Sequence, residues 1–164
     1  FNDVLQAAGG AVGLLNTGVI RMGGNSDTIA AVNTDPGLGE TFDIINTGEI
    51  RMGDGADTVI AAGTGLVDDE DAEGAAFFLG AGGDTFYGFG DVVVDAGAGA
   101  NDTLILSVDT TYSVTIVNDT VTFGVGPFGM DTTGFEFVQV GSEGASISVA
   151  DLAEGDSIDA TGIV

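Results

Sequence analysis

The sequence predicts an all-β fold organised as a solenoid of stacked coils. Three observations lead to this prediction: a long internal repeat, a turn signature that recurs behind it, and a composition poor in helix signals. The 164 residues include 29 glycines together with many Thr, Val and Ile residues, which favour turns and strands over helices. We therefore expect little or no helix.

The internal repeat has a period of 30 residues. The segment LLNTGVIRMG at 14–23 returns as IINTGEIRMG at 44–53, and a glycine-rich turn with an Asp-Thr pair follows each copy. Self-similarity at a fixed period is typical of repeat architectures. Each unit is interpreted as one coil, with Asn-Thr-Gly at a corner. In the second copy, alternation places Ile50 and Met52 inside and Glu49 and Arg51 outside.

The turn signature occurs four times, the last copy with one extra residue. Each turn ends in an aspartate, followed by threonine and then by an apolar residue. The aspartates are Asp27, Asp57, Asp84 and Asp102, and the apolar residues are Ile29, Val59, Phe86 and Leu104. Period-two alternation places each threonine outside and each apolar residue inside.

Charge and composition restrict the function. The formal net charge is −24, Arg21 and Arg51 are the two basic residues, and Lys, His and Cys are absent. Oxygen is therefore the abundant donor, which suits calcium rather than zinc or copper. Bound cations would relieve the self-repulsion. An acidic surface disfavours nucleic acid, and the glycine-diluted apolar run 4–20 disfavours membrane insertion.

The turn chemistry indicates shared calcium sites. Glycines reach backbone angles that let carbonyl oxygens converge, and the aspartate adds charge. Calcium takes six to eight oxygens, more than one turn supplies, so stacked turns would have to share an ion. For a single copy, an ordinary glycine or Asx turn remains the alternative. The Asn118-Asp119 turn lacks flanking glycines and is interpreted as a plain hairpin turn.

The turns resemble the nonapeptide repeats of the RTX, or hemolysin-type, calcium-binding family, with the pattern Gly-Gly-x-Gly-x-Asp-x-apolar-x. The segments 53–59 and 80–86 match best, although the aspartates lie 30, 27 and 18 residues apart and not in tandem nonapeptides. The resemblance implies a parallel β-roll or β-helix, calcium-dependent folding and export from a Gram-negative type of cell. The expected calcium ligands are Asp27, Gly53, Asp54, Gly55, Asp57, Gly80, Gly82, Asp84, Asp95, Gly97, Gly99 and Asp102.

The pattern changes near residue 106. Residues 112–117 and 120–125 predict a β-hairpin, and 135–140 and 145–149 predict later strands. We expect a calcium-binding β-solenoid over 1–106 and a C-terminal antiparallel β region over 107–164 packed on it. The acidic run 68–73 is interpreted as a solvated loop, with a peripheral cation site as the alternative. Arg21 and Arg51 are expected to point outward and to pair with acids such as Glu49.

Three functions compete. Catalysis is disfavoured because the usual nucleophiles and bases are absent and no carboxylate pair in an aromatic cleft stands out. The favoured hypothesis is an extracellular, calcium-stabilised structural protein that binds copies of itself, as a subunit of a cell-surface S-layer or filament. The apolar segment 4–15 motivates it. The alternative is a non-catalytic calcium-binding RTX module of a larger secreted toxin, protease or adhesin.

Overall fold

The computed structural model describes residues 1–35, 41–69, 74–126, 128–141, 144 and 146–161. Within these ranges the fold is all-β, and the one helical element is a single 3₁₀ turn, Val149–Asp151. The prediction of an all-β chain with little or no helix is confirmed. None of the described elements is a helix with the length and apolarity needed to cross a membrane.

The first twelve strands form four consecutive units of three strands each. The units are β1 (Val4–Gly9), β2 (Val12–Asn16) and β3 (Val19–Gly24); β4 (Thr28–Asn33), β5 (Phe42–Asn46) and β6 (Glu49–Asp54); β7 (Thr58–Ala61), β8 (Leu66–Asp68) and β9 (Ala76–Gly82); and β10 (Thr85–Tyr87), β11 (Phe89–Asp95) and β12 (Ala98–Gly99). Residues 30 apart in the predicted repeat are register partners in the first two units, so one period corresponds to one unit there.

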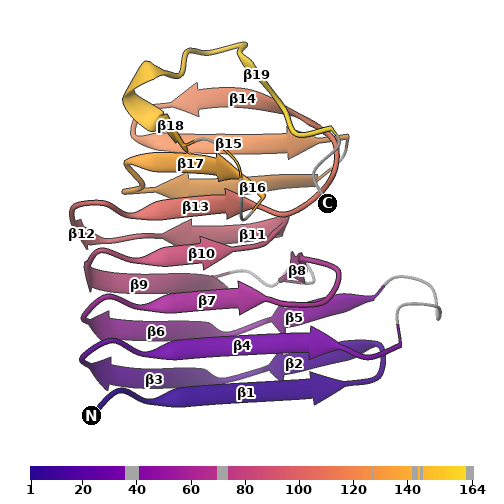
Figure 1. Cartoon of the computed structure of the whole chain (residues 1–164), viewed down its shortest axis with the longest axis vertical. Coiled ribbons are helices and arrows are strands. Elements are labelled where there is room, and N and C mark those ends of the chain that lie inside the picture. The colour runs from indigo at the N-terminus through magenta and orange to yellow at the C-terminus, as the bar shows by residue number, and fades with distance from the viewer. Residues whose placement is uncertain (36–40, 70–73, 127, 142–143, 145, 162–164) are drawn as a thin grey trace.

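Corresponding strands of successive units pair in parallel. The first strands of the four units, β1, β4, β7 and β10, lie side by side in a seven-stranded sheet. Three later strands continue it in the order β13 (Thr103–Leu106), β17 (Phe137–Val140) and β18 (Ser146–Ser148). Figure 1 shows these strands stacked along the long axis, from the N-terminus at the bottom. Every pair in this sheet is parallel except β17 with β18.

The second and third strands of the units belong to one branched twelve-stranded sheet. One branch runs β2-β5-β8 and the other runs β3-β6-β9, and β11 joins them because it pairs with both β8 and β9. The repeated Asn-Thr-Gly forms the predicted corner between the branches. There Asn16 Nδ2 donates to Asn46 Oδ1 at 2.7 Å, and Asn46 Nδ2 donates to the Ala76 carbonyl at 3.1 Å.

The predicted C-terminal hairpin is confirmed. It consists of β14 (Thr111–Val117) and β15 (Thr120–Val125), which pair antiparallel around Asn118 with φ of 55°. The strand β16 (Phe128–Thr133) extends the hairpin and also pairs in parallel with β11, while β19 (Ser157–Asp159) pairs with β14. Parallel pairing therefore continues beyond the expected boundary at residue 106, through β16 and β17.

The core lies between the sheets and follows the predicted alternation. Ile29, Val59, Phe86 and Leu104 occupy equivalent positions in adjacent strands and are fully buried. Phe86 meets Phe77 of β9 edge-to-face, with ring centroids 5.1 Å apart, a geometry that stabilises beyond simple burial. Ile50 and Met52 are also buried, whereas Arg51 is exposed, as predicted.

Candidate metal centre

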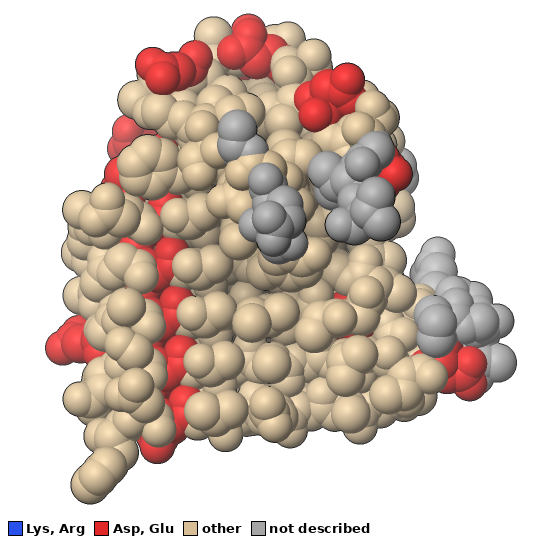
Figure 2. Space-filling model, in the orientation of Figure 1, with Lys and Arg blue, Asp and Glu red and all other residues tan. Residues whose placement is uncertain are grey.

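The four aspartates of the turn signature lie in one file along the molecule. Each occurs immediately before a strand of the seven-stranded sheet, and the register of those strands places the four residues in successive units. Figure 2 shows the resulting file of acidic residues running up one side of the front face. We call these residues the carboxylate ladder: Asp27, Asp57, Asp84 and Asp102.

The ladder is buried, which the sequence interpretation did not anticipate. The four residues are at most 1% exposed. The signal was present, because the alternation that places Ile29 inside also places Asp27, two residues earlier, on the same side of the strand. The burial therefore follows from the same pattern that predicted the core.

One carboxylate oxygen of each aspartate binds the neighbouring unit. The backbone N–H of Asp27 donates to Oδ1 of Asp57, that of Asp57 to Asp84, and that of Asp84 to Asp102, each at 2.7 Å. Asp3 donates in the same way to Asp27 at 2.7 Å, and Glu136 Oε2 accepts from Asp102 at 2.8 Å. The hydrogen bonds thus link units whose aspartates are 18 to 30 residues apart in sequence.

The other oxygen, Oδ2, has no hydrogen-bond partner among the described residues at any of the four aspartates, and it is buried. An ionised carboxylate left in this state is costly. Adjacent strands lie about 5 Å apart, and two like charges at that distance repel by roughly 3 kcal/mol at an effective dielectric constant of 20. A proton, a bound water or a cation at Oδ2 would offset this cost.

Burial also changes the acidity of the ladder. Loss of solvation raises the pKa of Asp84 to about 6, an effect partly opposed by the hydrogen bond from the Asp57 amide. Burial likewise raises the pKa of Asp57 and that of Asp102. The negative charges of Asp57 and Asp102 add to the shift at Asp84. Protonation of these three aspartates is therefore easier than that of an exposed carboxyl.

Glycines let the turns stack beside the ladder. Gly53 has φ of 113° and Gly80 has φ of 114°, and a Cβ on Gly80 would lie 1.8 Å from the carbonyl oxygen of Gly53. Only glycine permits this approach together with that backbone angle. In the first turn Asn25 replaces the second glycine with φ of 87°, and the extra residue of the last turn, Asn101, has φ of 72°. Asparagine tolerates this conformation better than most residues.

The remaining predicted ligands have different environments. Gly55, Gly82 and Gly99 form a second stacked file in the turns, because a Cβ on Gly82 would lie 1.5 Å from the Gly55 oxygen and one on Gly99 1.9 Å from the Gly82 oxygen. Gly97 stacks similarly on Gly80. In contrast, the side chain of Asp54 is exposed at the outside of its turn.

Asp95 performs a local role instead of joining the ladder. Its Oδ1 accepts hydrogen bonds from the Gly97 N–H at 3.0 Å and from the Thr133 hydroxyl at 3.1 Å. Asp119 lies exposed in the hairpin turn, away from any glycine file. The structure therefore lines up four of the six predicted aspartate ligands. Asp54 and Asp95 lie outside this file, although the charge of Asp54 is a minor cause of the raised pKa of Asp57, after burial.

The donor chemistry of the ladder fits a hard cation such as calcium. Each ladder aspartate offers a buried carboxylate oxygen without a partner among the described residues, and a carboxylate oxygen is a hard donor. Within the described ranges, no group of three or more acidic side chains is placed so that it could hold a metal by itself. An ion at the ladder would therefore need carbonyl oxygens from the turns in addition to one or two carboxylates.

Asp43 is a fifth buried aspartate that the sequence interpretation missed. Its Oδ1 accepts from the backbone and side-chain N–H groups of Asn33 at 2.8 and 3.1 Å. Its Oδ2 accepts from the backbone N–H of Gly63 and Gly65 at 3.0 and 2.7 Å, and from the Thr64 hydroxyl at 3.4 Å. Its charge is thus met by donors from two segments, Asn33 and residues 63–65, and it requires no cation.

The two arginines lie outside the ladder. Arg21 and Arg51 are register partners on β3 and β6, and both are exposed. Arg51 pairs with Glu49 at 2.8 Å, as expected, and its guanidinium also lies 4.4 Å from the ring centroid of Phe78. This pairing lowers the pKa of Glu49, chiefly through the hydrogen bond from Arg51. Neither arginine neutralises the buried aspartates.

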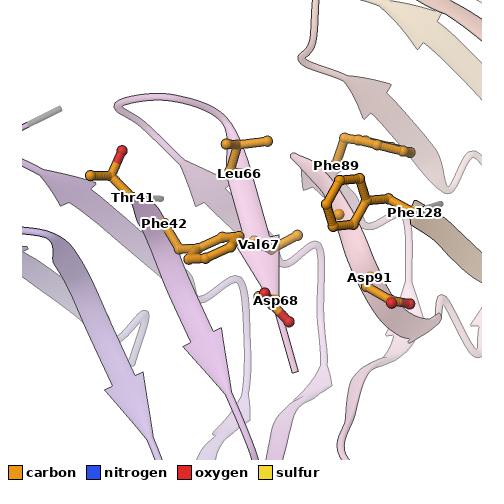
Figure 3. A pocket seen from close by; sticks show the side chains of 9 residues that line it. Thr41, Phe42, Leu66, Val67, Asp68, Phe89, Asp91 and Phe128 are labelled. Carbon is orange, nitrogen blue, oxygen red and sulfur yellow. The ribbon is translucent and has the colours of Figure 1, made fainter. Parts of the chain in front are cut away.

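A separate pocket opens beside β5, β8 and β11. It has a volume of about 270 Å³, and its lining includes Phe42, Phe89 and Phe128. Figure 3 shows Asp68 and Asp91 at one end of it, and these two residues are register partners on neighbouring strands. Asp68 belongs to the predicted acidic loop but ends a strand instead, whereas residues 70–73 of that loop lie outside the described residues. The pocket combines aromatic walls with negative charge.

Comparison with protein-family models, with curated proteins and with solved structures found no match.

Proposed function

We propose that this chain is an extracellular, calcium-stabilised structural protein whose units are the coils of a parallel β-solenoid of the β-roll or β-helix type. The observation that carries the proposal is the ladder, in which four equivalent buried carboxylates each have one oxygen without a partner. In a chain of net charge −24, such a file is a liability unless cations enter it. The turn sequences, with their RTX resemblance, point to calcium.

The protein's own residues would hold calcium with hard oxygen donors. Oδ2 of neighbouring ladder aspartates and carbonyl oxygens of the stacked glycine turns are the candidate ligands. Calcium would supply charge neutralisation between units, and Oδ1 would keep its hydrogen bond to the adjacent backbone. Binding to the folded state alone would then stabilise the fold by mass action. The role is structural, and no reacting group is required.

Self-assembly into a cell-surface layer or filament is the second part of the proposal. Among the described residues, β1, β2 and β3 are each paired on one side alone, by β4, β5 and β6. The opposite end finishes in the antiparallel strands β18 and β19. An unpaired strand edge invites intermolecular pairing. The alternative is that the chain is a module of a larger secreted protein, in which the same edge pairs with further coils.

The test is a calcium titration of the metal-free protein. We expect calcium to raise the melting temperature and chelation to reverse the rise, with heat of binding seen by isothermal titration calorimetry. The variants Asp57→Asn and Asp84→Asn should weaken binding, and Asp119→Asn, which removes the same charge from an exposed turn, is the matched control. Equal losses in all three variants would show that net charge, and not the ladder, governs binding. An unchanged melting temperature would refute the calcium role.

A further inference from the structure

The pocket beside β5, β8 and β11 has an apolar end and an acidic end. The strands β8 and β11 pair in parallel, with Leu66 opposite Phe89 and Asp68 opposite Asp91. Two residues along a strand span about 6.6 Å and return to the same face, and Figure 3 shows the two pairs at opposite ends of the pocket. Between them on β11, Gly90 carries no side chain that could fill the space. The pocket thus changes from apolar to acidic along the strands.

Aromatic rings border the pocket on both sides of the β8–β11 pair. Phe42 comes from β5, on one side of the pair, and Phe128 comes from β16, on the other. Phe89 packs edge-to-face on Tyr112, with ring centroids 4.9 Å apart, which fixes its ring. Phe128 is 47% exposed, so its ring borders both the pocket and the solvent. The faces of such rings attract cations.

The charge of the pocket restricts the kind of ligand that it can take. Asp68 and Asp91 are partly exposed and lie on adjacent strands, which are about 4.8 Å apart. Neither arginine of the chain lines the pocket, and the chain has no lysine. The net charge of −24 also attracts cations toward the whole surface. The electrostatic complement of this pocket is therefore a cation.

The aromatic walls favour an organic cation over a metal ion. A calcium ion takes six to eight oxygen ligands, and phenylalanine supplies none. Among the described residues, no group of three or more acidic side chains is placed to hold a metal. An ammonium group, in contrast, can donate hydrogen bonds to carboxylates and contact ring faces. The volume of about 270 Å³ lies just below the usual range for drug-sized ligands, so the ligand is small.

We propose that this pocket binds a small primary alkylammonium ion. Its ammonium group lies between Asp68 and Asp91, and its hydrocarbon chain lies along Leu66 and Phe89, beside the ring of Phe128. A ligand with so few atoms has a limited binding free energy, so we expect a dissociation constant on the order of millimolar. The pocket shares no residue with the carboxylate ladder, and this site is independent of the calcium role.

The test is an NMR titration of the isotope-labelled protein in saturating calcium and at constant ionic strength. The probe is n-butylammonium. The comparison compounds are 1-butanol, which lacks the charge, and methylammonium, which lacks the hydrocarbon chain. We expect n-butylammonium to shift the methyl signals of Leu66 and to bind at least about tenfold more tightly than either comparison compound.

Two substitutions test the two kinds of contact separately. Asp91→Asn should weaken the binding of n-butylammonium at least about tenfold and leave that of 1-butanol nearly unchanged. Phe128→Leu keeps an apolar side chain but removes the ring, and it should weaken the binding of n-butylammonium several-fold. The matched control is Asp119→Asn, which removes the same charge from the exposed hairpin turn and should leave the binding unchanged. Circular dichroism checks the fold of each variant.

Four outcomes would overturn the site. The absence of any shift at Leu66 would show that the pocket stays empty. Equal affinities for n-butylammonium and 1-butanol would show that it does not select charge. Equal weakening by Asp91→Asn and Asp119→Asn would mean that net charge alone attracts the ion, and displacement by further calcium at constant ionic strength would indicate a metal site instead. Melting curves in calcium and in chelator report separately on the ladder, so either result can fail alone.

Discussion

The ladder and Asp43 show two ways in which one chain buries aspartate. Asp43 receives five donors from two segments, so both of its oxygens are satisfied. Each ladder aspartate has one satisfied oxygen and one without a partner. A buried carboxylate whose two oxygens both accept hydrogen bonds stabilises the fold. A buried carboxylate with one oxygen unpaired can bind a proton or a cation at that oxygen. The difference separates a structural acid from a candidate site.

The sharpest test of this comparison is the same substitution at both kinds of position. In Asp43→Asn, an amide N–H₂ would replace the oxygen that accepts from Gly63 and Gly65, so donors would face donors. We expect a loss of about 2–4 kcal/mol in the free energy of unfolding. The loss should be the same in calcium and in chelator. Urea denaturation in both buffers measures it, and a calcium-dependent loss would mean that Asp43 also contacts an ion.

The matched variant in the ladder should have the opposite sign without calcium. In Asp84→Asn, the amide oxygen can keep the hydrogen bond from the Asp57 N–H, and the amide nitrogen can occupy the position of the partnerless oxygen. Removal of a buried negative charge then stabilises the calcium-free protein, on the order of 1 kcal/mol. In saturating calcium the variant should lose its advantage. If Asp84→Asn destabilises the calcium-free protein, an unrecognised donor must already satisfy Oδ2.

These two sites also differ in what the sequence could predict. The 30-residue repeat and the alternation after each turn predicted the strands, the inward Ile29 and Val59, and the four equivalent aspartates. Their burial was predictable as well, since Asp27 and Ile29 are two residues apart on one strand. Asp43 could not be predicted, because its donors come from Asn33 and from the segment around Gly65, which only the folded register brings together.

The missing glycine in the first turn illustrates another limit of pattern matching. The first turn lacks the second glycine that the other three turns carry before their aspartate. The structure places Asn25 there with positive φ, and Asp27 is as buried as the other ladder residues. A consensus pattern names the commonest residue, whereas the backbone requires only one that tolerates the left-handed conformation.

The pH dependence provides the next prediction. The pKa of Asp84 is raised to about 6, and those of Asp57 and Asp102 are also raised, so the folded state binds protons more tightly than the unfolded state. In chelator, stability should therefore rise as the pH falls from 7 toward 4.5, and it should be lost as the pH rises through about 6. In calcium, protons compete with the ion, so the calcium-induced rise in melting temperature should shrink over the same interval. Parallel pH profiles in the two buffers would contradict a shared site for protons and calcium.

The end of the ladder gives the smallest expected effect, because Glu136 is intermediate between the two kinds of carboxylate. Its Oε2 accepts from the Asp102 amide at 2.8 Å, but its side chain is only half-buried, and its charge contributes to the raised pKa of Asp102. In Glu136→Gln the amide oxygen can retain the hydrogen bond while the charge is removed. We expect the calcium-free protein to become slightly more stable, by less than in Asp84→Asn, because solvent screens a partly exposed charge. The pKa of Asp102 should move toward its ordinary value, which carboxyl-carbon NMR titration would detect. Equal stabilisation by Glu136→Gln and Asp84→Asn would show that total negative charge matters more than burial and the partnerless oxygen.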